Sequence, residues 1–379
     1  MNFEFTEEQQ MVRDSIARFV QDDYDFDTRR QIVASATGLN REYWQTFAEL
    51  GWLSIPFAEE DGGFGGNIID IAVVMEELGK GLVVEPYFPT VVLFGGLLAR
   101  AGSDEQRAAY LPGVIDGSTL GALAFVERQS RFALSDCLTT VTANDAGFTL
   151  TGEKVVVSNG EHADKLIVLA RTSGTQFDEQ GLSLFLVDAT ATGVSKMAYP
   201  MMDGQRVANI TFDQVTLDPS ALLGTLGQGL ALVEALSHEA IIALAAEAVG
   251  IMGTLNAKTL EYTKTRQQFG VAIGSFQALQ HRMVDTMMAY EQSRSMLYRA
   301  LCEYVQDPAS ARATIHALKV LIDRNSKLVY GEAIQLHGGM GITDELDIGH
   351  YAKRLMMINA TFGDGTYHRS RFSALQYAA

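Results

Sequence analysis

The strongest constraint on the fold is a long helical pattern that stops and is followed at once by another. Before the break, apolar side chains recur every three or four positions, which is the spacing of one face of an α-helix. They are Leu232, Leu236, Ala240, Leu244, Ile251 and Leu255. A second stripe follows, with Phe276, Leu279, Met283 and Met287. Because glycine favours the conformation that ends a helix, we expect the first helix to stop at Gly270.

The chain has 379 residues, enough for several domains, and its pattern divides it into three segments. Residues 1–118 predict helices and loops, opened by a capping-box pattern at Thr6 and Gln9. Residues 119–222 contain short β-forming runs separated by turns, which predicts a sandwich or barrel. Residues 223–379 return to helix. The expected strands lie at 120–126, 138–143, 148–150, 155–157, 166–170, 182–187 and 210–212, and further helices at 42–50, 68–78, 276–304, 308–336 and 348–362.

Two glycine-rich stretches do not match the known phosphate loops. Residues 61–66 lack the spacing of a dinucleotide motif and any lysine after it, so we predict a turn before a helix. Residues 224–229 follow no strand of a βαβ unit and have the wrong spacing. A Rossmann dinucleotide site is therefore not expected.

Composition narrows the classes of function. A formal net charge of −17 argues against nucleic acid or an anionic membrane as a partner. The two cysteines, Cys137 and Cys302, fit a reducing compartment and give no disulfide framework. No Cys/His spacing typical of zinc occurs, the acidic start does not look like a signal peptide, and no run of about 18 apolar residues is present. We expect a cytoplasmic protein without a metal site.

The break after the first long helix resembles a motif of the acyl-CoA dehydrogenase family, whose members bind FAD. The matching residues are Arg266, Gln268, Phe269, Gly270, Phe276, Gln277 and Gln280. A second family motif runs from Gln335 to Gly341. In that family the arginine binds the FAD pyrophosphate of the neighbouring subunit, and a guanidinium fork suits a diphosphate. Taken alone, Arg266 could instead complement the dipole at the helix end.

The resemblance covers essentially the whole chain and implies an α+β multidomain fold. It implies an N-terminal helical domain at 1–118, a central β-barrel or sandwich at 119–222 and a C-terminal four-helix bundle at 223–379. It also implies bound FAD and an oligomer, because each protomer holds part of its neighbour's cofactor. The implied FAD contacts are Arg266, Gln268, Phe269, Phe276, Gln277, Gln280, Gln335, Gly338, Gly339, Phe125, Ser158 and Thr366. The implied substrate contacts are Ser135, Ala240 and Leu244.

Three of these implied contact residues also have simpler interpretations. Ser158 corresponds to a family residue that places a hydroxyl near the flavin N5, but Ser-Asn-Gly is also a common hairpin turn. Gly338 and Gly339 suit the close approach of a phosphate or ribose. They could equally cap the preceding helix.

The resemblance implies dehydrogenation of an acyl-CoA thioester to the 2-enoyl-CoA. A carboxylate removes the α-proton in a dry pocket that raises its pKa, and the flavin accepts the β-hydride. We consider Glu247, Asp364 and Glu239, in that order. Asp364 aligns with the usual base but is one methylene shorter. A second family position for the base falls on Ala240, which cannot act, and Glu239 points about 100° away around the helix.

Glu247 interrupts the apolar stripe two helical turns after Ala240. An unpaired buried carboxylate is costly. Glu247 is therefore either the base, or the partner of a cation on a neighbouring helix, or exposed at the edge of the stripe.

Several positions depart from the family pattern near the flavin. Val126, Leu134 and Val156 stand where the family has threonine, glycine and tryptophan. The chain resembles the small subunits of bacterial acyl-CoA dehydrogenases for dicarboxylic or steroid side-chain substrates. The alternative function is therefore an FAD-binding partner subunit of a heterotetramer, with little activity alone. The resemblance further implies electron-transfer flavoprotein as electron acceptor, and a homodimer, homotetramer or heterotetramer all fit it.

Overall fold

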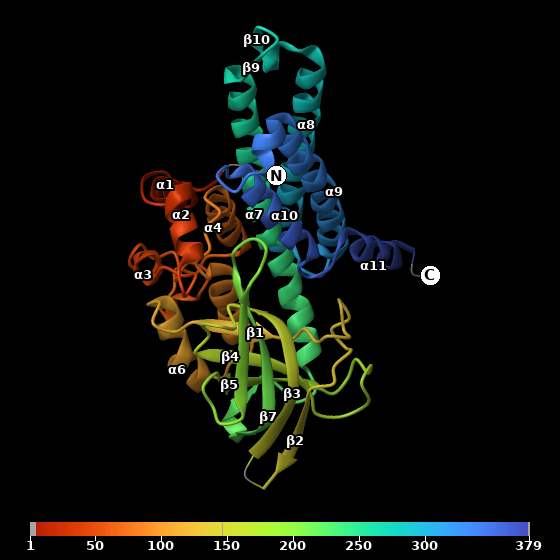
Figure 1. The fold of residues 1–379 in the computed structure, drawn as a ribbon. Coiled ribbons are helices and arrows are strands. Elements are labelled where there is room, and N and C mark those ends of the chain that lie inside the picture. The colour runs from red at the N-terminus through yellow and green to blue at the C-terminus, as the bar shows by residue number, and fades with distance from the viewer. Residues whose placement is uncertain (1–4, 146, 378–379) are drawn as a thin grey trace. The chain divides into compact units, whose positions relative to one another are not determined.

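The computed structural model describes residues 5–145 and 147–377. The chain packs as two compact units, each assembled from segments that are distant in the sequence. Among the described residues, unit 1 contains 5–32, 68–83 and 241–377, and unit 2 contains 33–67, 84–145 and 147–240. Unit 1 is mainly helical, and unit 2 holds the large sheet (Figure 1). The order of helices, strands and helices confirms the α+β fold class.

Unit 1 is built of long helices. Its described helices are α1 (Glu7–Asp22), α4 (Ile68–Lys80), α8 (Gln277–Gln306), α9 (Arg312–His337), α10 (Ile348–Ala360) and α11 (Gly365–Tyr377), with most of α7 (Gly229–Thr265), most of α2 (Phe26–Ala34) and the 3-10 turns η4 (Ile273–Ser275) and η5 (Gly338–Ile342). The predicted capping box is confirmed, because Thr6 and Gln9 exchange two hydrogen bonds of 3.1 Å. Helix α11 was not predicted.

Glycines let α4 and α7 approach until their backbones touch. A Cβ on Gly250 would lie 2.1 Å from the carbonyl oxygen of Glu76, and one on Gly79 would lie 2.6 Å from that of Glu247. Any side chain at these positions would push the helices apart. The crossing buries this part of α7, and Glu247 is only 5% exposed.

We predicted that the first long helix ends at Gly270, and this prediction is wrong. The helix ends at Thr265 and is followed by a hairpin of β9 (Gln267–Gln268) and β10 (Val271–Ala272). The two turn residues, Phe269 and Gly270, have φ angles of 56° and 81°. Positive φ at both positions is typical of a type I′ turn, so Gly270 serves the hairpin and not a helix cap. Figure 1 shows the hairpin at the tip between the end of α7 and the start of α8.

Helix α7 is long and apolar enough to cross a membrane, judged by length and composition alone. However, 78% of its most apolar window is buried inside the protein. Burial of this kind is typical of a core helix, and we assign the apolar character of α7 to the protein core.

Unit 2 contains one eight-stranded sheet. Its strands follow the order β6-β7-β3-β2-β4-β5-β8, and β1 lies beside β4 in a parallel pair. The strands are β1 (Gly121–Ala124), β2 (Thr140–Asn144), β3 (Gly147–Ser158), β4 (Lys165–Arg171), β5 (Leu182–Asp188), β6 (Val194–Pro200), β7 (Arg206–Leu217) and β8 (Leu222–Leu223). The sequence missed β6 because most of its side chains are exposed and give no apolar alternation.

Strand β3 joins two strands that were predicted separately. The turn expected at 151–154 is instead a bulge, because the register with β7 shifts between Leu150 and Gly152. Gly152 has a φ of 148°, and a Cβ there would lie 2.6 Å from the Cα of Thr139. Glycine thus permits an irregular strand at a point where the sequence suggested a reversal.

The remaining elements of unit 2 include the turn that we predicted at residues 61–66. This unit also contains helices α3 (Arg41–Glu49), α5 (Gly96–Ala101) and α6 (Asp104–Ile115), the π-helix η2 (Phe88–Gly95) and the 3-10 turns η1 (Glu59–Asp61) and η3 (Pro219–Ala221). The amides of Gly63, Gly65 and Gly66 donate to backbone carbonyls of residues 55–58. They are therefore not free to bind a phosphate.

Candidate active site

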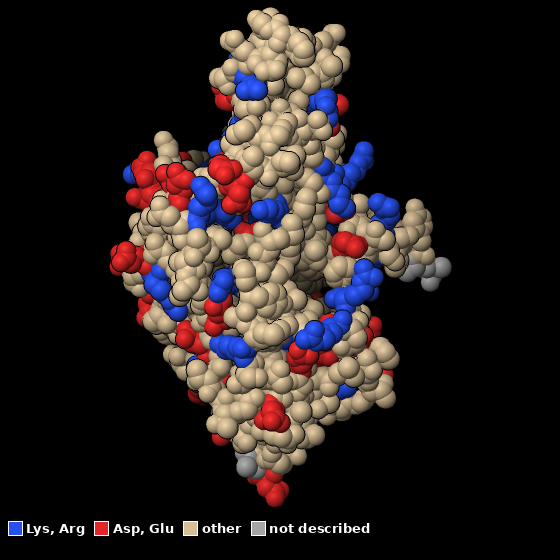
Figure 2. Space-filling view, viewed as in Figure 1, with Lys and Arg blue, Asp and Glu red and all other residues tan. Residues whose placement is uncertain are grey.

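The hairpin at the tip of unit 1 exposes an aromatic side chain. Phe269 is 92% exposed, and its ring meets that of Phe276 edge-to-face at 6.1 Å. A phenylalanine at positive φ is strained, and such strain is concentrated at functional sites. Gln277 and Gln280 of α8 are also exposed, and Gln280 donates to the carbonyl of Gly274. Figure 2 shows that this tip carries few charged residues.

Arg266 lies directly after the last turn of α7. Its amide donates to the carbonyl of Tyr262 at 2.8 Å, and its side chain is exposed. Among residues 5–145 and 147–377, its guanidinium has no hydrogen-bond or ion-pair partner. An uncommitted guanidinium is suited to a diphosphate.

The glycine loop after α9 leaves space for a ligand. A Cβ on Gly338 or Gly339 would meet nothing within 4 Å, whereas one on Gly341 would lie 2.7 Å from the carbonyl oxygen of Ile334. The first two glycines therefore face open space, and Gly341 is required for packing. Gln335, just before the loop, is exposed.

A stacked pair of rings connects this loop to the base of the hairpin. Tyr262 of α7 stacks on His337 with ring centroids 4.2 Å apart. The Nδ1 of His337 must be the donor to the carbonyl of Ala333 at 2.7 Å, because a carbonyl only accepts. Burial lowers the pKa of His337. Both sequence motifs therefore belong to unit 1. The guanidinium of Arg266, the exposed ring of Phe269 and the open space at Gly338 and Gly339 fit a flavin dinucleotide.

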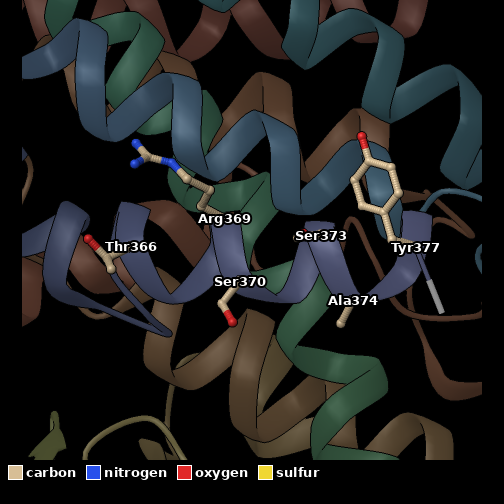
Figure 3. A pocket seen from close by; sticks show the side chains of 6 residues that line it. All are labelled: Thr366, Arg369, Ser370, Ser373, Ala374 and Tyr377. Atoms are coloured by element: carbon tan, nitrogen blue, oxygen red, sulfur yellow. The ribbon is translucent and has the colours of Figure 1, made fainter.

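Thr366 lies at the start of α11 and lines an open groove of about 690 Å³. The other lining residues are Arg369, Ser370, Ser373, Ala374 and Tyr377. Arg369 and Tyr377 point to one side of the helix, and Ser370 and Ala374 to the other (Figure 3).

In unit 2, Ser158 is the last residue of β3, and a fixed turn follows it. Asn159 is buried with a φ of 58°, and its side-chain Nδ2 donates to the Thr90 hydroxyl at 3.3 Å. Val156, at the position of the family tryptophan, is 41% exposed with a φ of 53°. Its amide donates to Oδ1 of Asn209 at 3.1 Å. Asn209 could not be identified from the sequence, because its contact with Val156 depends on pairing between β3 and β7.

A buried ion pair that the sequence missed closes the loop of residues 127–139. Lys154 and Glu127 are 0% and 4% exposed, with Nζ and Oε1 2.7 Å apart. The carboxylate also accepts from the amides of Leu138 and Thr139, at 2.7 and 3.0 Å. Burial alone would raise the pKa of Glu127, but Lys154 and the hydrogen bonds outweigh it and lower the pKa to about 2. Glu127 is therefore an ionised structural anchor.

The implied substrate contact Ser135 lies in the same loop. It is half-buried, and its carbonyl accepts from Nη2 of Arg171 at 2.8 Å. Arg171 is 5% exposed and donates to further carbonyls between residues 137 and 180. Phe125, an implied flavin contact, is half-buried directly after β1. The loop is thus held at both ends before any ligand binds.

Glu247 is held by an arginine, which is the alternative that the sequence left open. Nε of Arg354 on α10 donates to Oε1 at 2.5 Å, and Nη2 donates to Oε2 at 2.7 Å. Both residues are buried. Leu244, an implied substrate contact one turn earlier on α7, is also buried, at 1% exposure. The carboxylate of Glu247 is fully engaged by a charge-assisted, two-point contact.

Glu239 is also paired. Its Oε1 accepts from Nη2 of Arg100 at 2.5 Å, and the pair is partly exposed. Ala240, the next residue, is fully buried within unit 2.

Asp364 caps the start of α11. Its Oδ1 accepts from the amide of Tyr367 at 2.8 Å. Its Oδ2 accepts no hydrogen bond from the described part of the chain, and the residue is half-buried. Of the three carboxylates, Asp364 is the one that pairs with no arginine of the described chain.

Comparison with known proteins identifies the class. Three family models match: acyl-CoA dehydrogenase N-terminal domain at residues 6–118, middle domain at 122–215 and C-terminal domain at 227–374. The fold and the site define an FAD-dependent oxidoreductase. The chain belongs to the acyl-CoA dehydrogenase family, whose general reaction is FAD-dependent dehydrogenation of acyl-CoA thioesters.

Similar proteins match over nearly their full lengths. Probable acyl-CoA dehydrogenase YngJ of Bacillus subtilis (strain 168) is 29% identical over 377 residues, with 97% of this chain and 96% of the relative covered. The structure of PigA with FAD and proline has a TM-score of 0.91 at 27% identity and covers 99% of each chain. The Tcur3481-Tcur3483 steroid enzyme has a TM-score of 0.88 at 28% identity and covers 98% of this chain and 99% of its own.

Proposed function

We propose that this chain dehydrogenates an acyl-CoA thioester with Asp364 as the base that removes the α-proton. The observation that carries the proposal is the state of the three candidate carboxylates. Glu247 and Glu239 are each held by an arginine, whereas Oδ2 of Asp364 is unoccupied by the described residues. To accept a proton, Glu247 would have to give up its buried ion pair and leave Arg354 uncompensated.

The turn around Asp364 suits a base with a fixed position. One oxygen is held by the helix amide of Tyr367, so the carboxylate cannot rotate freely. The shorter aspartate has fewer rotamers than the family's glutamate, and less side-chain entropy is lost in the reactive geometry. Bound FAD would supply the hydride acceptor. In the oligomer, Arg266 and the glycines at 338 and 339 would hold the phosphates and ribose of the neighbouring subunit's FAD.

The proposal is tested with the chain expressed alone. The purified protein is mixed without oxygen with a panel of fatty and steroid side-chain acyl-CoAs, and the absorption of oxidised flavin is followed. Bleaching by one acyl-CoA, with loss of bleaching in an Asp364→Asn variant of equal flavin content, supports the proposal. Bleaching that survives in Asp364→Asn contradicts it.

A second candidate function, the partner subunit, is supported by the same ion pairs. If Asp364 acts only as a helix cap, none of the three carboxylates is available as the base, and the chain would contribute flavin-binding surface to a second subunit. One similar structure, the Tcur3481-Tcur3483 steroid enzyme, bears a paired name. A chain that binds FAD but is bleached by no acyl-CoA in the panel favours this function.

We further infer that the exposed apolar surface of unit 1 forms a subunit interface. Its exposed members near the hairpin and the glycine loop include Phe269, Val284, Met288, Met340 and Ile342. Large exposed apolar surfaces mark interaction sites. Sedimentation would show a dimer or tetramer, and a monomer at micromolar concentration would contradict the inference. We also propose electron-transfer flavoprotein as the electron acceptor and the cytoplasm as the location.

A further inference from the structure

We propose that His316 and His368 form a positioning pair that holds the turn carrying Asp364. The inference rests on the proposed role of Asp364 as the base. His316 lies on α9 and His368 on α11, and their Nδ1 atoms are 2.9 Å apart. The two residues are 5% and 1% exposed, so water does not compete for this contact.

The contacts of His368 fix the position of its protons. Its Nε2 lies 2.9 Å from the carbonyl oxygen of Phe362. A carbonyl only accepts, so Nε2 carries a hydrogen. The contact between the two Nδ1 atoms requires one hydrogen between them, and a neutral His368 must accept it. The hydrogen bonds therefore run from His316 through His368 to the carbonyl of Phe362.

That carbonyl belongs to a strained turn. Phe362 and Gly363 have φ angles of 57° and 112°. A non-glycine residue at positive φ persists only where its surroundings impose it. A Cβ on Gly363 would lie 2.6 Å from Nε2 of His368, so the turn rests directly on the imidazole. Asp364 is the next residue.

Helix α9 also holds both ends of this segment. The Nζ of Lys319, which is 1% exposed, donates to the carbonyl of Ile358 near the end of α10. A Cβ on Gly365 would lie 2.5 Å from Oδ2 of Asp323, so α11 begins against that carboxylate. His316, Lys319 and Asp323 are three and four residues apart and share one helical face. This face of α9 forms a rigid support for residues 358–368.

A base acts efficiently only when it is held close to the reactive geometry, because small displacements cost large factors in rate. Both histidines are buried, and His368 contacts the turn directly, so the pair acts on Asp364 through the backbone of the turn. Loss of the contact between His368 and Phe362 should loosen the turn and lower kcat. Binding of the acyl-CoA should change little.

The test replaces His368 by two amide side chains, each of which keeps one of its two hydrogen bonds, to Phe362 or to His316. In His368→Gln, the amide nitrogen lies near the position of Nε2 and can still donate to Phe362. In His368→Asn, the amide lies near Nδ1 and keeps only the contact with His316. The full-length FAD-bound protein is examined by hydrogen exchange of the backbone amides at 363–368, and by steady-state kinetics. Nitrogen NMR of the wild-type imidazoles reports their tautomers.

We expect His368 to be protonated at Nε2 in the wild type. His368→Asn should speed exchange of the turn amides and lower kcat about tenfold, with KM changed about twofold or less, while His368→Gln stays near wild type. Equal behaviour of the two variants, or an Nε2 without a proton, would overturn the pair.

Asp364→Asn separates this inference from the proposed function. If Asp364→Asn keeps full activity, the base assignment fails whatever the exchange data show, and the positioning role fails with it. If Asp364→Asn is inactive but His368→Asn leaves exchange and kcat unchanged, the base assignment stands and only the histidine pair is overturned.

Discussion

Glu247 and Arg354 form a buried two-point ion pair that joins α7 to α10, with contacts of 2.5 and 2.7 Å. The pair explains why an acid interrupts an otherwise apolar helix face. It also changes the order of the candidate bases, because the carboxylate that stood out in the sequence is the one most firmly committed in the structure. We therefore propose Asp364, and not Glu247, as the base.

Removing one partner of this pair should strongly destabilise the protein. Arg354→Met leaves the Glu247 carboxylate buried and uncompensated, and we expect a loss of about 3–5 kcal/mol in the free energy of unfolding. The double variant Glu247→Met/Arg354→Met removes both charges and should recover most of that loss. Urea unfolding of the three proteins checks this, and a double variant no more stable than Arg354→Met would contradict it.

Lys319 should make stability depend on pH in the alkaline range. Burial lowers its pKa from 10.5 to about 7. Between these values the unfolded chain binds a proton that the folded chain lacks, so stability should rise as pH increases from 7 toward 10.5. Lys319→Met should flatten this rise. Unfolding at several pH values measures it, with the exposed Lys327→Met as control, and an unchanged slope in Lys319→Met would argue against a buried, neutral amine.

Glu127 should contribute stability that disappears in acid. The pKa of Glu127 is about 2 in the folded protein, and the ordinary value of 4.5 applies to the unfolded chain. Its contribution to the free energy of unfolding is therefore complete above pH 4.5 and is lost as pH falls toward 2. Glu127→Gln should be less stable at neutral pH and show a flatter loss in that window. The surface variant Glu153→Gln, whose partner Arg128 is exposed, should change little. Equal effects of the two substitutions would refute the buried anchor.

Arg266 should contribute directly to FAD affinity. Arg266→Gln removes a guanidinium without a partner among residues 5–145 and 147–377, and we expect FAD to bind about tenfold more weakly with the fold unchanged. The control is Lys264→Gln, an exposed cation in the preceding turn that pairs with Glu261. Titration of the apoprotein with FAD, followed by flavin fluorescence, gives both affinities. Equal affinities for the two variants would remove Arg266 from the site.

The sequence predicted those parts of the fold that depend on periodicity. The stripes of α7 and α8 repeat over several turns, so the existence of these helices was clear. The predicted end of α7 was wrong because the turn of Phe269 and Gly270 depends on pairing between β9 and β10. Strands of two residues are too short to show an alternating pattern in the sequence. Helix α11 was missed because, beyond His368, most of its residues are exposed and no apolar stripe forms.

The candidate site shows the same division. The two flavin motifs could be recognised because each is continuous in the sequence, and both lie in unit 1. The role of their residues as FAD contacts stays a prediction. The ion-pair partners were not predictable, because Arg354 follows Glu247 by 107 positions and any of several cations could have met it. The anchor of Lys154 on Glu127 and the contact between His316 and His368 likewise require the packed structure.

The most direct test of the central claim is exchange of the α-hydrogen of a bound acyl-CoA with deuterated water, followed by mass spectrometry without an electron acceptor. Reversible proton removal by Asp364 predicts incorporation of deuterium by the wild type and by Glu239→Gln. In Asp364→Asn, the rate should fall by a factor of about 100 or more at equal FAD content. Incorporation by Asp364→Asn at the wild-type rate would contradict the account and return the search to another carboxylate.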